Sequence, residues 1–167
     1  MNPNKEWGGA WIVVRDGSPM SLSCKKNFLR LSRRAVSFFH YECEAKEAVK
    51  KTLRLAKKNK VDFGRKEDYA LLWANQKFVN GKAFFWLITE DGIPLKRFDI
   101  RLHQGGVKKL ILGKSQSGEA TLFWKKREAQ SHIRRMLDFA DEIGVYWGTK
   151  ERFRIVKVEA KEVKDEV

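Results

Sequence analysis

The sequence predicts an α+β protein built from two tandem copies of one small unit, with antiparallel-rich sheets that are each covered by one helix. Two aligned blocks predict this. A shift of 84 residues aligns 38–74 with 122–158 without a gap, and nine of the 37 pairs are identical. Upstream, 11–19 aligns with 86–94 at a shift of 75. Two blocks in the same order indicate an internal repeat. We expect the copies to pack about a pseudo-twofold axis or to extend each other's sheet.

Each copy begins with a predicted β-hairpin. Apolar strands are expected at about Ala10–Val14 and Ala83–Thr89. Each strand runs into an Asp-Gly pair, Asp16-Gly17 in the first copy and Asp91-Gly92 in the second. Asp-Gly is a strong signal for a tight hairpin turn, because both residues tolerate a left-handed backbone. A second strand should follow each turn.

A further strand should precede the helix of each copy, at Ala35–Tyr41 and at Ala120–Trp124. The two shifts differ by nine residues, so the second copy carries an insertion between the two aligned blocks. In this insertion we expect Val107–Leu112 to form a hairpin with Ala120–Trp124, which places an inserted hairpin near 103–118.

The helices are predicted from apolar residues spaced three and four apart. The first is expected over Glu44–Lys60 and the second over Arg127–Ile143. Gly144 suits the left-handed residue that ends a helix, and Asn59 can serve the first helix in the same way. The apolar stripes are Ala45, Ala48, Val49, Thr52, Leu53 and Ala56 in the first helix, and Ala129, Ile133, Met136, Leu137 and Ala140 in the second.

Each copy should end in a strand, at Asp68–Ala74 and at Arg152–Glu159. A helix with one apolar face against strands needs a sheet to cover, which completes the predicted unit. The predicted organisation is a first repeat over 1–75, a connector over 76–82, a second repeat over 83–158 and a charged tail over 159–167.

The charge balance favours a polyanionic partner. The chain has 35 Lys and Arg against 21 Asp and Glu, a net charge of +14, and a pI of about 9.9. Residues 1–75 hold 16 basic and 8 acidic residues, and residues 76–158 hold 17 and 9, so each half is +8. A surface this positive attracts nucleic acid at long range.

Residues that could bind phosphates cluster in both copies. On the first helix, Lys46, Lys50, Arg54 and Lys57 form a cationic stripe opposite the apolar one, and no neutralising group is apparent on the stripe itself. Lys and Arg at such places bind phosphates without reading sequence. The full set of candidate nucleic-acid-binding residues is Lys25, Lys26, Arg30, Arg33, Arg34, Lys46, Lys50, Arg54, Lys57, Lys108, Lys109, Lys114, Lys125, Lys126 and Arg127.

No catalytic or metal-binding signature stands out. The histidines are scattered, and His40 with Cys43 lacks the further ligands that a metal site needs. Gly113-Lys114-Ser115 resembles the end of a phosphate-binding loop, but Lys108 stands where that motif requires glycine. Glu44 and Glu159 each begin a Glu-x-Lys sequence, a form found in metal-dependent nucleases. We therefore predict no catalytic residue, no metal and no cofactor.

The first interpretation is a non-enzymatic nucleic-acid-binding protein that uses a basic surface on paired α/β repeats. An alternative is a phage or mobile-element protein that inhibits a host defence nucleoprotein complex (anti-CRISPR-like), and a second is a small metal-dependent nuclease. The chain has only two cysteines, no signal-peptide pattern at the start and no apolar run of about 20 residues. These features predict an intracellular, cytoplasmic protein without a membrane partner.

Overall fold

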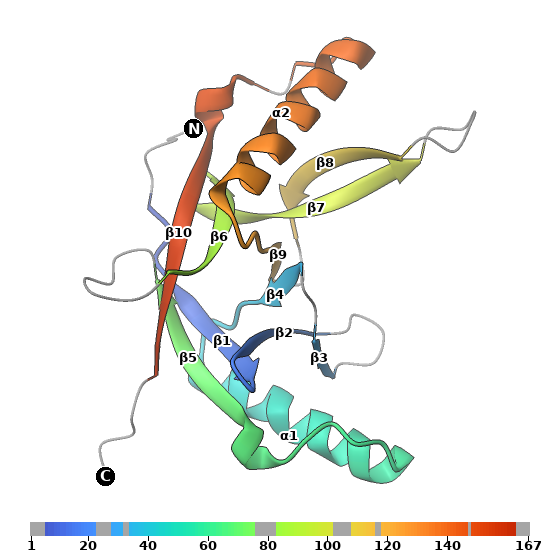
Figure 1. Ribbon diagram of the computed structural model, residues 1–167, viewed down its shortest axis with the longest axis vertical. Helices are drawn as coiled ribbons and strands as arrows, with labels where there is room; N and C mark the ends of the chain where they lie inside the picture. Colours follow the sequence, from blue (N-terminus) through green and yellow to red (C-terminus); the bar gives the residue numbers. More distant parts are fainter. Residues whose placement is uncertain are drawn as a thin grey trace.

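The computed structural model describes residues 6–22, 28–31, 34–75, 83–101, 108–115, 118–146 and 148–162. It is an α+β fold with a large curled antiparallel sheet and two helices (Figure 1). In the first half the elements are β1 (Ala10–Arg15), β2 (Ser18–Leu22), β3 (Leu29–Leu31), β4 (Ala35–Ser37), α1 (Glu42–Asn59), the 3-10 helix η1 (Lys66–Asp68) and β5 (Tyr69–Asn75). In the second half they are β6 (Ala83–Glu90), β7 (Ile93–Arg101), β8 (Lys108–Lys114), β9 (Glu119–Thr121), α2 (Lys126–Ile143), η2 (Lys150–Arg152) and β10 (Phe153–Glu162).

The large sheet joins the two halves of the chain. Its described strands follow the order β3-β2-β1-β5-β10-β6-β7-β8, and every neighbouring pair is antiparallel. β5 and β10 meet at the middle of this order, with Asn75 opposite Glu159. A separate ladder of β4 and β9 also crosses between the halves, with Val36 opposite Ala120. The expectation that the halves extend each other's sheet is confirmed.

Both predicted hairpin turns are present. Asp16 and Gly17 have φ of 50° and 79°, and Asp91 and Gly92 have φ of 55° and 76°. Two successive residues with positive φ define the turn type that matches the right-handed twist of the flanking strands. β1 therefore pairs with β2, and β6 with β7, directly beyond each turn.

The sheet curls because β1 and β6 each change partner along their length. β1 pairs with β2 only next to the turn, at Val14 and Arg15. Further back, Trp11 exchanges two backbone hydrogen bonds with Phe39, of 2.8 and 2.9 Å. Trp86 on β6 does the same with Phe123, at 2.7 and 2.9 Å. On their other edge, β1 and β6 stay paired with β5 and β10 along their whole length, so it is β2 and β7 that diverge from them beyond each turn.

The predicted hairpin between Val107–Leu112 and Ala120–Trp124 is wrong. β8 pairs with β7 along seven residues, from Leu95 opposite Lys114 to Arg101 opposite Lys108. β9 pairs instead with β4, more than 80 residues earlier in the chain. Ala120 is buried there beside Val36 in a cluster shared by both halves. This burial stabilises the pairing of β9 with β4, which turn signals in the local sequence cannot predict.

Two predicted element ends also move. Lys60, not Asn59, is the left-handed residue after α1, with φ of 52°, whereas Gly144 ends α2 as predicted, with φ of 72°. β10 continues to Glu162. It thereby takes up the first residues of the segment that the sequence predicted as a charged tail, because these residues pair with β5 from Leu72 to Asn75.

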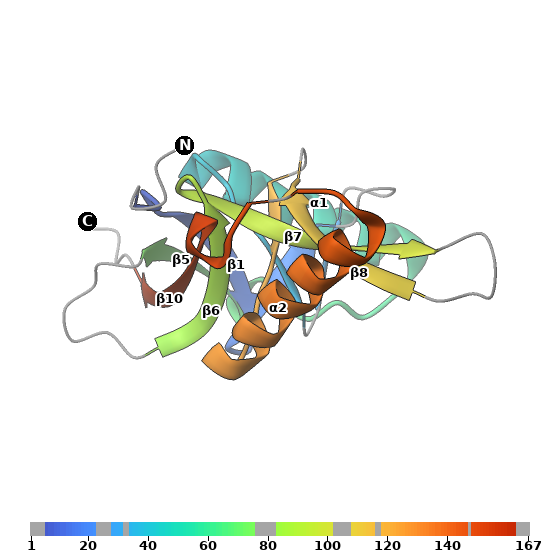
Figure 2. The same cartoon turned by 90° about the horizontal axis from the view of Figure 1, so that it is seen from above.

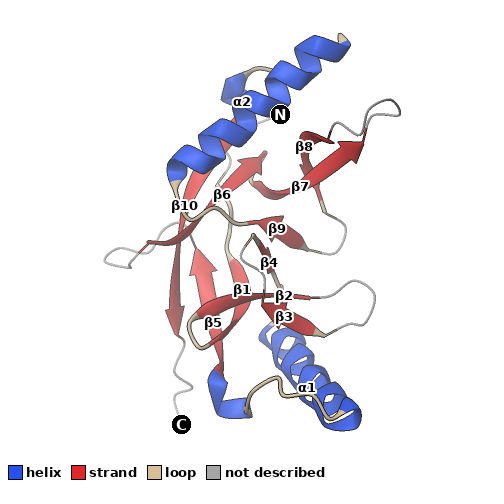
Figure 3. Cartoon of the chain, turned by 45° about the vertical axis from the view of Figure 1, so that its right-hand side comes forward, coloured by secondary structure: helices blue, strands red, loops and turns tan. Residues whose placement is uncertain are grey.

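The helices lie at opposite ends of the long axis of the molecule (Figures 1 and 3). Seen along that axis, both lie to one side of β5 and β10 (Figure 2). The predicted stripes face the core: Ala45, Ala48, Val49, Thr52 and Ala56 are buried on α1, and Ala129, Ile133, Met136, Phe139 and Ala140 on α2. Leu53 and Leu137 are half-buried and pack at the edge of these clusters.

Three clusters of buried apolar side chains hold the fold together. One lies under α1 and contains Val13, Met20, Leu29, Phe39 and Val49 among others. A second lies under α2 and contains Ile88, Leu95, Leu112, Phe123 and Ile133 among others. The third is central and takes six residues from each half, including Ile12, Val36, Phe85, Leu87 and Val158. The two halves are therefore packed into one body by a shared core.

Candidate nucleic-acid interface

Most of the predicted phosphate-binding residues lie on the surface. The exposed ones are Arg30, Arg34, Lys46, Lys50, Arg54, Lys57, Lys114, Lys125, Lys126 and Arg127. Lys108 and Lys109 begin β8. Lys25, Lys26 and Arg33 lie outside the described residues.

The structure does not gather these residues on one surface. The stripe on α1 (Lys46, Lys50, Arg54 and Lys57) lies at one end of the molecule, and Lys125, Lys126 and Arg127 lie at the start of α2 in the other half (Figure 3). From the sequence, no neutralising group is expected on the stripe, but the structure contains one. Lys46 Nζ lies 3.1 Å from the Glu42 carboxylate one helical turn earlier. Three exposed cations of the stripe remain beyond this pair.

A pocket of about 340 Å³ lies beside the start of α2. Its charged lining consists of Arg34, Arg97, Arg135 and Glu128, and its other lining residues include His132 and Trp124. We call it the arginine pocket. By formal charge, this lining carries three guanidinium groups and one carboxylate. A pocket of this size falls within the range of small-ligand sites, roughly 300–1,000 Å³.

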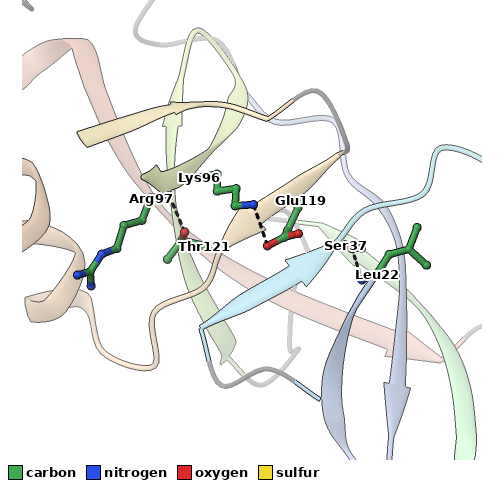
Figure 4. Close-up of polar contacts among 6 residues, drawn as sticks. All are labelled: Leu22, Ser37, Lys96, Arg97, Glu119 and Thr121. Atoms are coloured by element: carbon green, nitrogen blue, oxygen red, sulfur yellow. Dashed lines mark hydrogen bonds and ion pairs between the residues drawn. The ribbon is translucent and has the colours of Figure 1, made fainter. Parts of the chain in front are cut away.

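The backbone of β7 is fixed at the arginine pocket by β9. The Arg97 N–H donates to Thr121 Oγ1 at 2.7 Å (Figure 4). Next to it, Lys96 Nζ lies 3.3 Å from the Glu119 carboxylate, whose side chain is 8% exposed. This ion pair neutralises Glu119, so the carboxylate does not offset the charge of the nearby arginines. In Figure 4 the Arg97 side chain points away from this pair, toward α2.

His132 is held as a neutral imidazole at the wall of the pocket. Its Nδ1 lies 2.8 Å from the carbonyl oxygen of Glu128, which can only accept, so Nδ1 carries the proton. Its Nε2 lies 3.3 Å from Arg97 Nη1, which can only donate, so Nε2 accepts. Burial lowers the pKa of His132 below its ordinary value of 6.5, and the charges of Arg97 and Arg135 lower it further, against the opposing hydrogen bond to Glu128.

This neutral histidine predicts a pH dependence of stability. Because the pKa of His132 is lower in the folded state, the unfolded chain takes up its proton first as the pH falls. The contribution of His132 is fully present above about pH 6.5 and is lost as the pH falls below that value. Urea unfolding at pH 5.5 and 7.5 should show a smaller loss of stability in His132→Gln than in the wild type. An equal loss in both proteins would show that His132 does not titrate in this way.

A second pocket, of about 480 Å³, lies against α1 and differs in charge. It is lined by Leu22, Phe39, Cys43, Glu44, Glu47, Ala48 and Lys51. The 84-residue shift pairs Ala48 with His132 and Lys51 with Arg135, and the 75-residue shift, continued three residues past its aligned block, pairs Leu22 with Arg97. The backbone contact is the same in kind, since Leu22 N–H donates to Ser37 Oγ at 2.8 Å (Figure 4). Two carboxylates against one ammonium make this pocket negative, so the two places have opposite charge.

Of the charged residues that line the arginine pocket, the sequence predicted only Arg34 as a nucleic-acid-binding residue, and it missed Arg97, Arg135 and His132. Arg97 stands in a strand and is separated from His132 by 35 residues. A signal was present in the comparison of the two halves, because an arginine corresponds to a leucine and a histidine to an alanine at aligned positions.

The carboxylates proposed for a nuclease do not converge in the described part of the chain. No group of three or more His, Cys, Asp or Glu residues placed to hold a metal ion is found among the described residues. Glu44 is exposed in the first turn of α1. Glu159 is 7% exposed in the middle of the sheet, and Lys157 Nζ lies 3.6 Å from its Oε1.

Comparison with known proteins gave no match to a protein-family model, to a curated protein or to a solved structure. None of the described helices is both long enough and apolar enough to cross a membrane. The function must therefore be argued from the surface of the molecule itself.

Proposed function

We propose that this protein binds nucleic acid without catalysis, in the cytoplasm, and that it holds phosphate groups on its basic surface. The observation that carries this proposal is the arginine pocket with Lys125, Lys126 and Arg127 exposed beside it at the start of α2. Guanidinium groups bind phosphates through paired, charge-assisted hydrogen bonds. The stripe on α1 adds a second basic surface at the other end of the molecule.

Packing around the start of α2 supports an electrostatic role for these residues. The Lys126 ammonium lies 5.8 Å from the centre of the Trp86 ring, within the range of a cation–π contact, and the residue is exposed. Lys125 is the residue before the first helical turn and makes no side-chain cap. Both residues are exposed, so both charges are accessible to a phosphate.

We also propose that the two halves derive from duplication of one unit and are related by a pseudo-twofold axis. The support is the correspondence of their cores: the repeat alignment pairs Val13 with Ile88, Met20 with Leu95 and Phe39 with Phe123, and each pair occupies the cluster under its own helix. Gly64 and Gly148, identical in the alignment, also share a positive φ, of 81° and 89°. Function is then expected at the places where the halves differ, and their two pockets differ in charge.

The proposal predicts a steep dependence of affinity on salt. Binding that releases counterions from phosphates makes log K fall linearly with log salt, by about 0.9 for each duplex phosphate and about 0.7 for each single-strand phosphate neutralised. A fluorescence-anisotropy titration of a labelled oligonucleotide from ~50 to ~200 mM salt measures this slope. Four to six phosphate contacts would lower the affinity roughly 50- to 2,000-fold over this range. A flat response, or no binding of any DNA or RNA at the lowest salt, would overturn the proposal.

A further inference from the structure

The arginine pocket carries an aromatic residue that phosphate binding alone does not require. Trp124 lines the pocket and remains 49% exposed, although a tryptophan usually dominates a core or an interface. The neighbouring aromatic Phe123 is 3% exposed and packs in the cluster under α2. Trp124 thus lies just outside the core, at the place where the chain turns from β9 into α2.

An exposed indole beside guanidinium groups matches the two parts of an unpaired nucleotide. Proteins that bind single strands combine a positive groove for the backbone with aromatic side chains on which bases stack. In a duplex the bases are paired and stacked on one another, so an indole at the surface has no base face to meet. The volume of about 340 Å³ also exceeds what a phosphate group alone would fill.

We propose that the arginine pocket holds one phosphate of a single-stranded nucleic acid and that Trp124 stacks on the adjacent base. The inference rests on the proposed function, which it makes specific for unpaired strands. Arg97 is held toward the pocket by its backbone bond to Thr121 and its contact with His132. Arg34 and Arg135 add charge from the other half and from α2, and Glu128 keeps the site from being uniformly positive.

The pocket against α1 is the matched control within the same chain. It lies at the aligned positions, yet Glu44 and Glu47 make it repel a phosphate. Lys51 occupies the position that the alignment pairs with Arg135, and both side chains are exposed. Removing either one takes a single positive charge from the same place on its helix. A difference between Arg135→Ala and Lys51→Ala therefore reports on the pocket and not on net charge.

The experiment compares a labelled 12-nucleotide single strand with a hairpin duplex of the same sequence by fluorescence anisotropy at one salt concentration. The wild type should bind the single strand more tightly. Stacking on an aromatic side chain contributes about 1–3 kcal/mol per base, so Trp124→Ala should weaken single-strand binding about 5- to 150-fold and leave duplex binding unchanged. Trp124→Phe should keep most of the affinity. Tyr41→Ala, which removes an aromatic residue that is 66% exposed before α1, should have no effect.

The outcomes separate this inference from the proposed function. If the wild type binds neither probe, the proposed function itself fails. If it binds both, but Trp124→Ala behaves like Tyr41→Ala and Arg135→Ala like Lys51→Ala, the proposed function stands and the pocket inference is overturned. Tighter binding of the duplex overturns it as well. Displacement of the strand by an equal concentration of a mononucleotide would assign the pocket to a free nucleotide and would also overturn it.

Discussion

Truncation of Phe85 to alanine is expected to lower the free energy of unfolding by about 3–5 kcal/mol. Phe85 is 1% exposed and belongs to the central cluster that both halves build. Its loss removes a large buried surface and leaves a cavity that the paired strands β6 and β10 cannot close. Since small proteins are stable by only about 5–15 kcal/mol, this is a large share of the total.

Urea unfolding followed by both circular dichroism and tryptophan fluorescence measures this loss. The two signals should coincide in one transition, because the central cluster makes the halves depend on each other. Phe85→Leu, with a smaller loss, provides a measurement if the alanine variant does not fold. Tyr146→Ala is the control, since Tyr146 is 82% exposed and its loss should change stability by no more than about 0.5 kcal/mol. Two separate transitions in the wild type would contradict the shared core.

Reversal of three basic residues to glutamate is expected to weaken nucleic-acid binding by roughly 100- to 500-fold at either proposed basic surface. At ~0.1 M salt each phosphate contact contributes about five- to eightfold to affinity, and three contacts would be lost together. One variant changes Lys50, Arg54 and Lys57 on α1 and leaves Lys46 in its pair with Glu42. A second changes Lys125, Lys126 and Arg127. All six side chains are exposed, so the fold should be preserved.

The control variant changes Lys60, Lys66 and Lys150, which are also exposed and lie outside both surfaces. All three variants lower the net charge from +14 to +8, because each reversal removes two charges. Binding to one labelled oligonucleotide is compared at a single salt concentration. Equal losses in the three variants would show an effect of net charge without a defined interface. If the α1 variant behaves like the control, the stripe is a solvated helix face and the interface lies at the arginine pocket.

The helices and hairpins were predictable because their signals are local. The spacing of Ala45, Val49 and Ala56 depends only on the helical period, and α1 differs from its predicted range by two residues at its start. Asp16-Gly17 and Asp91-Gly92 specify a turn through their own backbone preferences. Such features arise within a few residues of sequence and need no knowledge of the remaining fold.

The pairing of β9 with β4 and the arginine pocket depend on contacts that are distant in the chain. Arg34 reaches the pocket because Leu122 N–H donates to the carbonyl oxygen of Arg34 at 2.9 Å, across 88 positions. Arg97 lies on a strand at the position that corresponds to the apolar Leu22 in the first half. A single sequence shows that these two residues differ, but it does not show which side chains lie next to Arg97 in the folded protein. A pocket built from residues that are distant in the chain can be recognised only from the folded sheet.

The place of β10 in the sheet has a consequence for synthesis on the ribosome. β10 is the last strand that the structure describes, yet it lies between β5 and β6, on which it depends for all its ladder hydrogen bonds. While the chain emerges, β5 and β6 each expose an edge that is able to pair with other nascent chains. The first half thus has to wait until β10 has been synthesised before its sheet is closed. A chain that stops before Phe153 would keep both edges open, and a ribosome stalled at that point would hold an aggregation-prone intermediate.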